Sequence, residues 1–274
     1  MIPAPFEYLR AGSAEEAISL LAEHGDDAKV LAGGHSLLPL MKLRLATPGV
    51  LIDIGELREL SYIRDGGDHV AIGALTCHRD LERSELLQHE VPLLSFTAHL
   101  VGDPQVRNRG TIGGSLAHAD PASDLPAAVL GLGGTLVVTG REGSRHLAAD
   151  KFFTGFLESA LAPDELLTEI RVPKTGDAGW SYQKFNRRAQ DWAIVAVAAV
   201  TGPQPRVALV NMGPTPMRAA ATEAALVSGA SAAEAAELAA DGTEPPTDIN
   251  ATPDYREHLA RVLTRRALAE AGVA

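Results

Sequence analysis

The chain has 274 residues, 46% of them hydrophobic, which is enough apolar material for one large globular core or for two compact domains. Its formal net charge of −11, with no block of lysine and arginine, argues against a nucleic-acid partner because a phosphate backbone would be repelled. No apolar run is long enough to span a bilayer and the N-terminal residues lack the pattern of a secretory signal, so we expect a cytoplasmic protein.

The first 54 residues predict a small β-α-β-α-β-like unit. Ser13 followed by Glu16 is a capping box that starts a helix, and Gly25 suits the left-handed end of that helix. After this helix the spacing of the apolar residues no longer follows the helical period. The elements expected next are a strand at 28–31, a short helix at 37–42 and a second strand at 50–54.

Residues 55–175 form the second predicted part. Its expected elements are a strand at 69–73, a helix at about 84–101, a helix near 123–130, and strands at 135–139 and 167–172. Residues 173–177, Pro-Lys-Thr-Gly-Asp, are typical of a loop at a boundary between domains.

Residues 176–274 form the third predicted part. Its expected strands lie at 180–185, 193–200 and 207–211, and helices follow them. Ser231 and Glu234 make another capping box, and residues 239–253 predict a surface loop. An apolar stripe on the last helix consists of Tyr255, Leu259, Val262 and Leu263. The expected domains are therefore 1–54, 55–175 and 176–274.

Two glycine-rich segments in the first half of the chain carry the functional signal. The first is Ala-Gly-Gly-His-Ser at 32–36 and the second is Thr-Ile-Gly-Gly-Ser at 111–115, each expected to follow a strand or an extended stretch. Without a Cβ, glycine lets successive backbone N–H groups converge on an anion, and it adopts the positive φ angles that such a nest requires. The pair therefore predicts a site for a diphosphate-bearing cofactor.

Other nucleotide and hydrolase motifs fit less well. The sequence has no Gly-x-x-x-x-Gly-Lys-Ser/Thr and no Gly-x-Gly-x-x-Gly after a strand, so no standard nucleotide motif is indicated. Ser115 lies one residue from a nucleophile-elbow pattern, and three residues follow in the order of an α/β-hydrolase: Asp120, Asp124 and His146. The preceding residues 103–109 are polar and contain a proline, whereas an elbow needs a buried strand there, which disfavours a serine hydrolase.

The remaining polar clusters have plainer interpretations. His118, Asp120 and Asp124 are spaced like metal ligands, but a turn followed by a helix cap explains the aspartates, and no second cluster completes a metal site. Lys184 begins a basic run that fits a solvated strand edge or a source of positive charge for a bound phosphate. The single cysteine, Cys77, allows no internal disulfide and no iron–sulfur cluster, so any metal centre must lie on other chains.

Taken together, these segments resemble a known family. The run 32–42, the segment 111–115 and Ser-Asp-Leu-Pro at 123–126 are similar to the FAD-binding medium subunit of molybdenum hydroxylases, of the aerobic carbon monoxide dehydrogenase type. The flavin domain of xanthine dehydrogenase is a more distant relative. The similarity extends over nearly the whole chain and includes Lys-Phe at 184–185, Asp-Trp-Ala at 191–193 and Gly-Pro-Thr-Pro at 213–216.

The resemblance implies an α+β protein with the FAD-binding PCMH-type (vanillyl-alcohol-oxidase-like) fold: two α/β subdomains, then a C-terminal α+β domain with a small antiparallel sheet and helices. It implies FAD as the cofactor, with both glycine-rich segments around the diphosphate. The implied cofactor-binding residues are Ala32, Gly33, Gly34, His35, Ser36, Leu37, Thr111, Ile112, Gly113, Gly114, Ser115, Asp124, Leu167, Lys184 and Trp192. No catalytic side chain and no metal ligand is implied.

Within that set the resemblance gives individual roles. Asp124 hydrogen-bonds the cofactor, Leu167 lines its adenine or ribose end, Lys184 lies beside the flavin, and Trp192 lies near the isoalloxazine ring, where an aromatic side chain stacks well. Gln190 departs from the glycine of the commoner Arg-Ala-Gly-Asp pattern, and a larger side chain with a narrower choice of φ puts the geometry of the flavin edge in question.

The function implied is electron relay. A large subunit with molybdenum cofactor would oxidise the substrate, a 2Fe-2S small subunit would pass on single electrons, and FAD on this chain would deliver pairs to an external acceptor. The implied assembly is a dimer of such heterotrimers. Judged from the residues, a flavin- or nucleotide-binding module without a redox partner stays an alternative.

Overall fold

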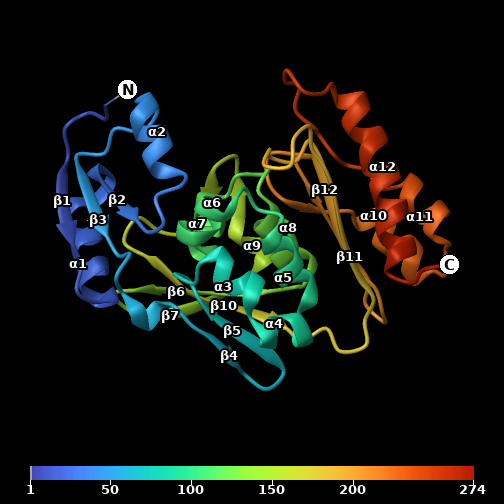
Figure 1. Cartoon of the computed structure of the whole chain (residues 1–274), viewed down its shortest axis with the longest axis horizontal. Coiled ribbons are helices and arrows are strands. Elements are labelled where there is room, and N and C mark those ends of the chain that lie inside the picture. Colours follow the sequence, from blue (N-terminus) through green and yellow to red (C-terminus); the bar gives the residue numbers. More distant parts are fainter. Residues whose placement is uncertain (1) are drawn as a thin grey trace.

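The N-terminal part is built around three parallel strands in the order β1-β3-β2. In the computed structural model, which describes residues 2–274, these strands are β1 (Glu7–Arg10), β2 (Ala28–Leu31) and β3 (Val50–Asp53), drawn in blue in Figure 1. Helices α1 (Ala14–His24) and α2 (Leu37–Leu43) make the crossovers, with 3₁₀ turns at Gly25–Asp27 and Arg58–Leu60. The β-α-β-α-β-like unit is thus confirmed.

The ends of α1 follow the sequence signals. The Ser13 side chain accepts a hydrogen bond from the Glu16 amide at 3.2 Å, and Gly25 ends the helix at φ +55°. The inner face of the helix buries Ala17, Ile18 and Leu21.

A five-stranded antiparallel sheet forms the middle of the molecule, in the order β4-β5-β10-β6-β7. Its strands are β4 (Ile63–Asp65), β5 (His69–Gly73), β6 (Thr135–Gly140), β7 (Gly143–Ala148) and β10 (Leu166–Pro173). The helices of this part are α3 (His78–Arg83), α4 (Glu85–Glu90), α5 (Pro92–His99), α6 (Pro104–Arg109), α7 (Ile112–His118) and α8 (Asp124–Gly131). Between β7 and β10 the chain forms α9 (Ala149–Phe152) and a small hairpin of β8 (Phe153–Gly155) and β9 (Glu158–Ser159).

One helix prediction and one prediction of an extended stretch are wrong in this part, and prolines explain both. The expected helix at 84–101 is divided at Val91 into α4 and α5, because Pro92 has no N–H to continue α4 and starts α5 instead. Residues 103–109 are not an extended stretch: Asp103 caps α6 by accepting from the Val106 amide at 2.9 Å, and Pro104 takes the first helical position. The second glycine-rich segment therefore follows a helix.

The C-terminal part is a four-stranded antiparallel sheet covered by helices. Its strands, in sheet order, are β11 (Trp180–Phe185), β12 (Val195–Val200), β13 (Arg206–Val210) and β14 (Met217–Arg218). The helices are α10 (Ala220–Val227), α11 (Ala232–Glu237) and α12 (Pro253–Glu270), which Figure 1 shows on the outer side of the sheet. The Ser231 capping box is present, and 239–253 contains no helix or strand before Pro253 starts α12.

The apolar stripe on the last helix is confirmed only in part. Leu259 and Leu263 are buried, but Tyr255 is 43% exposed and its ring lies edge-on to Phe185. The core of α12 is completed by Ala267 and Leu268 instead.

One continuous core joins the middle of the molecule to the C-terminal sheet. It contains Ile72 of the middle sheet, Leu94 and Leu116 of the helices, and Ala198 and Val210 of the C-terminal sheet. Helices α5 and α8 therefore lie between two sheets, and α8 is buried along its whole length. Among residues 2–274 no helix has the length and apolar character needed to cross a membrane.

Candidate cofactor-binding site

A cavity of about 780 Å³ lies where the N-terminal part, the middle helices and the start of the C-terminal sheet meet. This volume falls in the range of small-molecule sites. Fourteen of the fifteen residues predicted for the cofactor line it: Ala32, Gly33, Gly34, His35, Ser36, Leu37, Thr111, Gly113, Gly114, Ser115, Asp124, Leu167, Lys184 and Trp192. Ile112 does not, because its side chain is fully buried in the core.

The first glycine-rich segment presents open backbone donors to this cavity. It joins β2 to α2, and Gly34 takes the left-handed conformation at φ +77°. Within residues 2–274 the amides of residues 33–37 donate no hydrogen bond. Consecutive amides left open around a left-handed glycine form the kind of concave nest that binds an anion.

The second glycine-rich segment works differently, and the expectation that it also offers open amides is wrong. Thr111 caps α7, and the four amides that follow are already engaged. They donate to Thr76 O at 3.0 Å, Ala74 O at 2.8 Å, Thr111 Oγ1 at 3.1 Å and Thr111 O at 3.0 Å. Gly113 permits this close approach: a Cβ there would lie 2.5 Å from that of Ala74. The segment therefore offers the cavity a surface without large side chains.

The two glycine-rich segments touch each other at Gly33. A Cβ at Gly33 would lie 2.1 Å from the carbonyl oxygen of Arg109 and 3.0 Å from the α-carbon of Gly110, a separation that no other residue permits without a shift of backbone. Gly33 thus permits the close packing of the two segments, whereas Gly34 permits the positive φ angle of the backbone.

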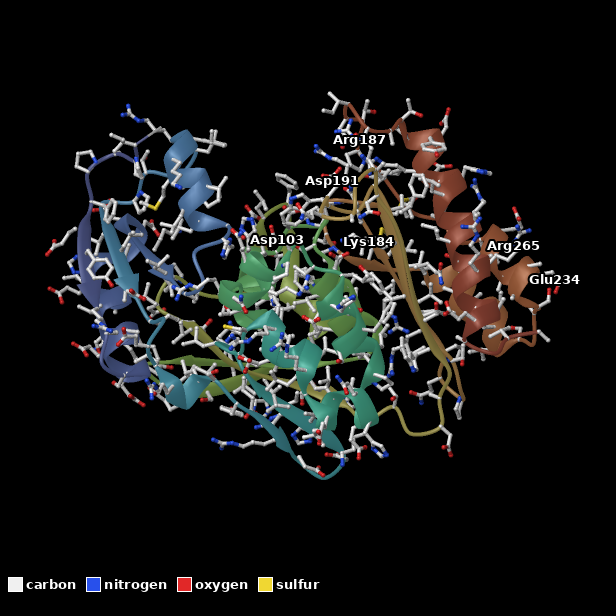
Figure 2. All side chains as sticks on the ribbon, in the orientation of Figure 1. Asp103, Lys184, Arg187, Asp191, Glu234 and Arg265 are labelled. Carbon is white, nitrogen blue, oxygen red and sulfur yellow. The ribbon has the colours of Figure 1, made fainter. Side chains whose placement is uncertain are left out.

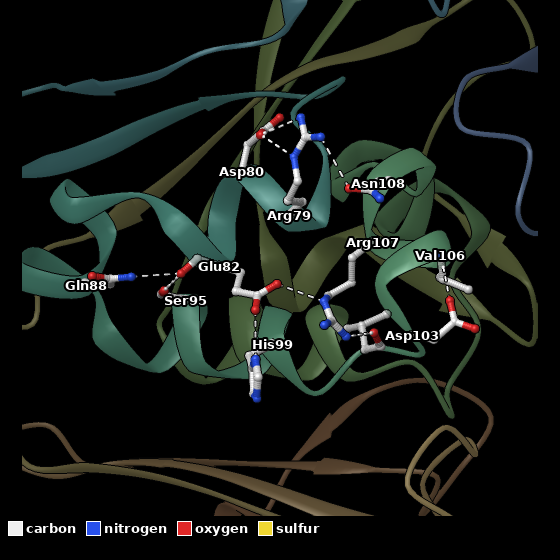
Figure 3. Close-up of polar contacts among 11 residues, drawn as sticks. Arg79, Asp80, Glu82, Gln88, Ser95, His99, Asp103, Val106, Arg107 and Asn108 are labelled. Atoms are coloured by element: carbon white, nitrogen blue, oxygen red, sulfur yellow. Dashed lines mark hydrogen bonds and ion pairs between the residues drawn. The ribbon is translucent and has the colours of Figure 1, made fainter.

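Helix α6 leads to this contact and is held by the partly buried carboxylate of Glu82 (Figure 3). Glu82 of α3 accepts from Arg107 Nε at 2.8 Å and lies 2.9 Å from His99 Nδ1, and the Arg107 guanidinium also donates to Val101 O. Burial pushes the pKa of Glu82 upward, but the hydrogen bond to His99 and the charge of Arg107 hold it below its usual value. Three helices, α3, α5 and α6, are tied together at this one group.

An ion pair lies at the inner wall of the cavity. Lys184 Nζ is 2.8 Å from Asp124 Oδ2 and donates to Leu100 O at 3.2 Å, and Tyr182 donates its hydroxyl to Asp124 Oδ1 at 2.7 Å. Figure 2 shows Lys184 between the middle helices and β11. Burial raises the pKa of the Asp124 carboxyl, and the Lys184 charge acts in the opposite direction.

This pairing corrects two interpretations made from the residues. Asp124 is not a helix cap: Ser123 holds that position, and the Asp124 carboxylate faces Lys184 and Tyr182. Lys184 is not on a solvated edge, because its side chain is only 6% exposed. Both carboxylate oxygens of Asp124 are engaged by the protein, so its direct bond to the cofactor stays a prediction.

Trp192 stands at the rim of the cavity, 57% exposed. It also borders a second cavity of about 700 Å³ under the loop 244–250. Figure 2 shows Arg187 and Asp191 at the end of the C-terminal sheet, and Asp191 pairs with Arg188 at 3.1 Å. The residue in the glycine position, Gln190, does not have a positive φ, so the backbone there does not require glycine.

Two residues that line the cavity or support its wall were not predicted from the sequence. Tyr182 lies two positions before Lys184 on the same strand, so its side chain points to the same face, and strand alternation was the signal that would have found it. His78 lines the cavity from the start of α3, and its sequence context carries no comparable signal.

The alternative sites have no supporting geometry. Ser115 lies inside α7, after another helix, and not at a strand-to-helix elbow. No three His, Cys, Asp or Glu side chains among residues 2–274 are grouped so that they could hold a metal ion.

Comparison with known proteins identifies a family of flavoproteins. The FAD binding domain in molybdopterin dehydrogenase matches residues 4–175, and the CO dehydrogenase flavoprotein C-terminal domain matches residues 180–271. The carbon monoxide dehydrogenase medium chain of Hydrogenophaga pseudoflava is 43% identical over 98% of this chain and 97% of its own length. The xanthine dehydrogenase FAD-binding subunit of Escherichia coli O157:H7 is 26% identical over 96% of this chain and 95% of its own length.

Solved structures give the same result. The carbon monoxide dehydrogenase of Hydrogenophaga pseudoflava that lacks the Mo-pyranopterin moiety superposes with a TM-score of 0.96 at 45% identity, covering 99% of this chain and 98% of that one. Quinoline 2-oxidoreductase from Pseudomonas putida 86 superposes with a TM-score of 0.92 at 34% identity, over 99% and 98%. The expected α+β fold is therefore confirmed. The chain belongs to the family of FAD-binding medium subunits of molybdenum hydroxylases, an oxidoreductase family, and its cofactor is FAD.

Proposed function

We propose that this chain is the electron-relay subunit of its molybdenum hydroxylase. FAD, when bound, takes up two electrons and releases them to an acceptor outside the complex. The residues of this chain bind the cofactor, orient it and limit its contact with solvent. The observation that carries the proposal is the 780 Å³ cavity, which joins a nest of open amides to a buried lysine and an exposed tryptophan.

The cavity suggests which residue holds which part of the cofactor. We assign the anionic diphosphate to the open amides of residues 33–37, with Gly113 and Gly114 bordering it through their missing side chains. Lys184 supplies a fixed positive charge beside the flavin, oriented by Asp124. Trp192 covers the ring at the rim, and Leu167 lines the other end.

The partners of the relay are part of the same proposal. A 2Fe-2S small subunit would deliver electrons and a large subunit with molybdenum cofactor would oxidise the substrate, in a dimer of heterotrimers. Cys77 as the single cysteine supports a cluster on another chain, since one thiolate cannot hold it. The substrate is bound elsewhere in the complex, so this chain does not define it. The cytoplasmic location expected from the sequence remains a prediction.

We also propose that residues 1–54, 55–175 and 176–274 act as three structural units. Each contains a sheet of its own, which supports the division. The cavity is bordered by all three, so the relative position of the units sets its shape.

The relay is tested with the complete complex purified from its native host, prepared with FAD and with FAD removed. Both forms are reduced anaerobically with limiting sodium dithionite and mixed with a soluble quinone. We expect iron–sulfur absorbance to bleach in both forms but to return rapidly only where FAD is bound, and FAD added back should restore the fast phase. Equally fast reoxidation of the FAD-free form would overturn the relay. A flavin-containing chain that copurifies with no iron–sulfur protein would favour the partner-free module.

A further inference from the structure

His78 is a buried imidazole that none of the roles above uses. It is 5% exposed, lies at the first position of α3 and lines the cavity together with both glycine-rich segments. Its Nδ1 atom is buried, and no group within residues 2–274 hydrogen-bonds it. A buried ring nitrogen without a hydrogen-bond partner costs free energy in the folded protein, so the imidazole is incompletely satisfied by the chain itself.

The surroundings of His78 place it behind the junction of the two glycine-rich segments. Its backbone amide donates to Gly110 O at 2.9 Å, and a Cβ on Gly110 would lie 2.7 Å from His78 Nε2. Gly110 in turn packs against Gly33. The imidazole is therefore fixed next to the point where the diphosphate nest begins.

The protonation state of the ring defines what it offers a ligand. Burial lowers the pKa of His78 to about 4, and the nearby charges of His35 and Arg107 act in the same direction. The imidazole is therefore neutral near pH 7 and carries one N–H donor and one acceptor nitrogen. Such a group binds an oxygen without adding charge.

We propose that His78 is a cofactor-binding residue, which donates a ring N–H to an oxygen of the diphosphate–ribityl part of FAD. This inference rests on the proposed placement of the cofactor with its diphosphate at residues 33–37. The open amides and the imidazole then hold the same stretch of the cofactor from two sides.

The test separates a hydrogen bond from packing by using substitutions that retain one and not the other. His78→Phe retains a ring of similar size without a donor, whereas His78→Asn and His78→Gln are less bulky but place an amide near Nδ1 or Nε2, respectively. Each variant of the complete complex is stripped of FAD, and the dissociation constant for FAD is measured by titration. His89→Phe is the matched control, because that side chain is 85% exposed on α4.

We expect His78→Phe to weaken FAD binding by about tenfold, and one of the two amide variants to bind within about threefold of the wild type. His89→Phe should bind like the wild type. The inference is overturned if His78→Phe binds normally, or if both amide variants bind more weakly than His78→Phe, since that order is the signature of packing. If His78→Phe does not fold, the two amide variants decide the test. The inference is then overturned if both of them bind FAD more than threefold more weakly than the wild type. A wild-type complex without affinity for FAD would instead overturn the proposed function.

Discussion

Gly33 is the residue at which the two glycine-rich segments meet. A methyl group there would overlap the backbone of Arg109, which cannot move aside as a flexible side chain would. Glycine is thus required at the two positions of the first segment for different reasons: Gly33 avoids a steric clash, and Gly34 adopts a positive φ angle. The sequence motif alone does not distinguish the two.

Gly33→Ala is therefore expected to push the segments apart and to weaken FAD binding by at least about tenfold. The FAD content of the purified complex and its dissociation constant are the measurements. Gly12→Ala serves as the control, because the added methyl would meet only the end of the Glu16 side chain, at 3.2 Å. Full FAD occupancy in Gly33→Ala would show that the contact at Arg109 is not needed.

The buried pair of Asp124 and Lys184 gives a second prediction. Lys184→Met leaves the buried carboxylate without its ammonium, so we expect the free energy of unfolding to fall by about 3–5 kcal/mol. Adding Asp124→Asn should recover a large part of this loss, since no unpaired charge then remains buried. Urea unfolding of the two single variants and the double variant measures the coupling; additive effects would contradict a direct interaction.

His78 makes stability depend on pH in a defined direction. Its pKa is about 4 in the folded chain against 6.5 for an ordinary histidine, so the unfolded chain binds more protons between these values. Stability is therefore expected to fall as the pH drops from about 6.5 to about 4, by up to about 3 kcal/mol. Urea unfolding at pH 7 and pH 4.5 tests this for the cofactor-free full chain. His78→Phe should lose this part of the slope, and an unchanged slope would mean that other groups cause it.

At the scale of elements, the sequence predicts those strands and helices whose apolar pattern is local. Strand β12 is buried at every position and α1 has a capped, one-sided face, so both are evident. Strand β1 has no apolar face, because three of its four residues are exposed, and its place depends on pairing with β3 far along the chain. Helix α6 looks like a loop in sequence, and only its cap and its contact with Glu82 make it helical.

The same logic applies to the candidate site. The glycine-rich segments and their lining role were predictable because backbone chemistry there depends on residue type alone. The engagement of amides 112 and 113 was not, because their acceptors are carbonyl groups of Thr76 and Ala74, which the sequence does not connect with that segment. The partners of Asp124 and Lys184 likewise depend on how the C-terminal sheet packs on α8.

The contacts of the Glu82 carboxylate with α5 and α6 lead to a prediction about how these helices are held together. Glu82→Gln removes the charge between Arg107 and His99, while the bonds of Ser95 and Gln88 to the Glu82 carbonyl remain. We expect a loss of about 1–3 kcal/mol in the free energy of unfolding and weaker FAD binding, because α6 leads to the contact at Gly33. Glu257→Gln, in an (i, i+4) pair on α12, is the control and should change stability by only a few tenths of a kcal/mol. Equal effects of both changes would contradict a special role of Glu82.

At the scale of the whole molecule, the shared core has a consequence for folding. Helix α8 is buried between the middle sheet and the C-terminal sheet, so removal of residues 176–274 would expose its outer face. We expect a fragment of residues 1–175 to unfold without a cooperative transition, whereas the full chain should show one. Thermal unfolding followed by circular dichroism compares the two, and a sharp transition in the fragment would show that the middle part is stable alone.

We place FAD in the cavity that the three parts of the chain border. The most direct measurement is to purify the complete complex from its native host under mild conditions, denature it, and identify and quantify the released cofactor by visible spectrum and mass. We expect one FAD for each copy of this chain, with the amount reduced in Gly33→Ala but not in Gly12→Ala. A wild-type complex that releases no flavin and stays colourless when FAD is added would show that the cavity does not hold FAD.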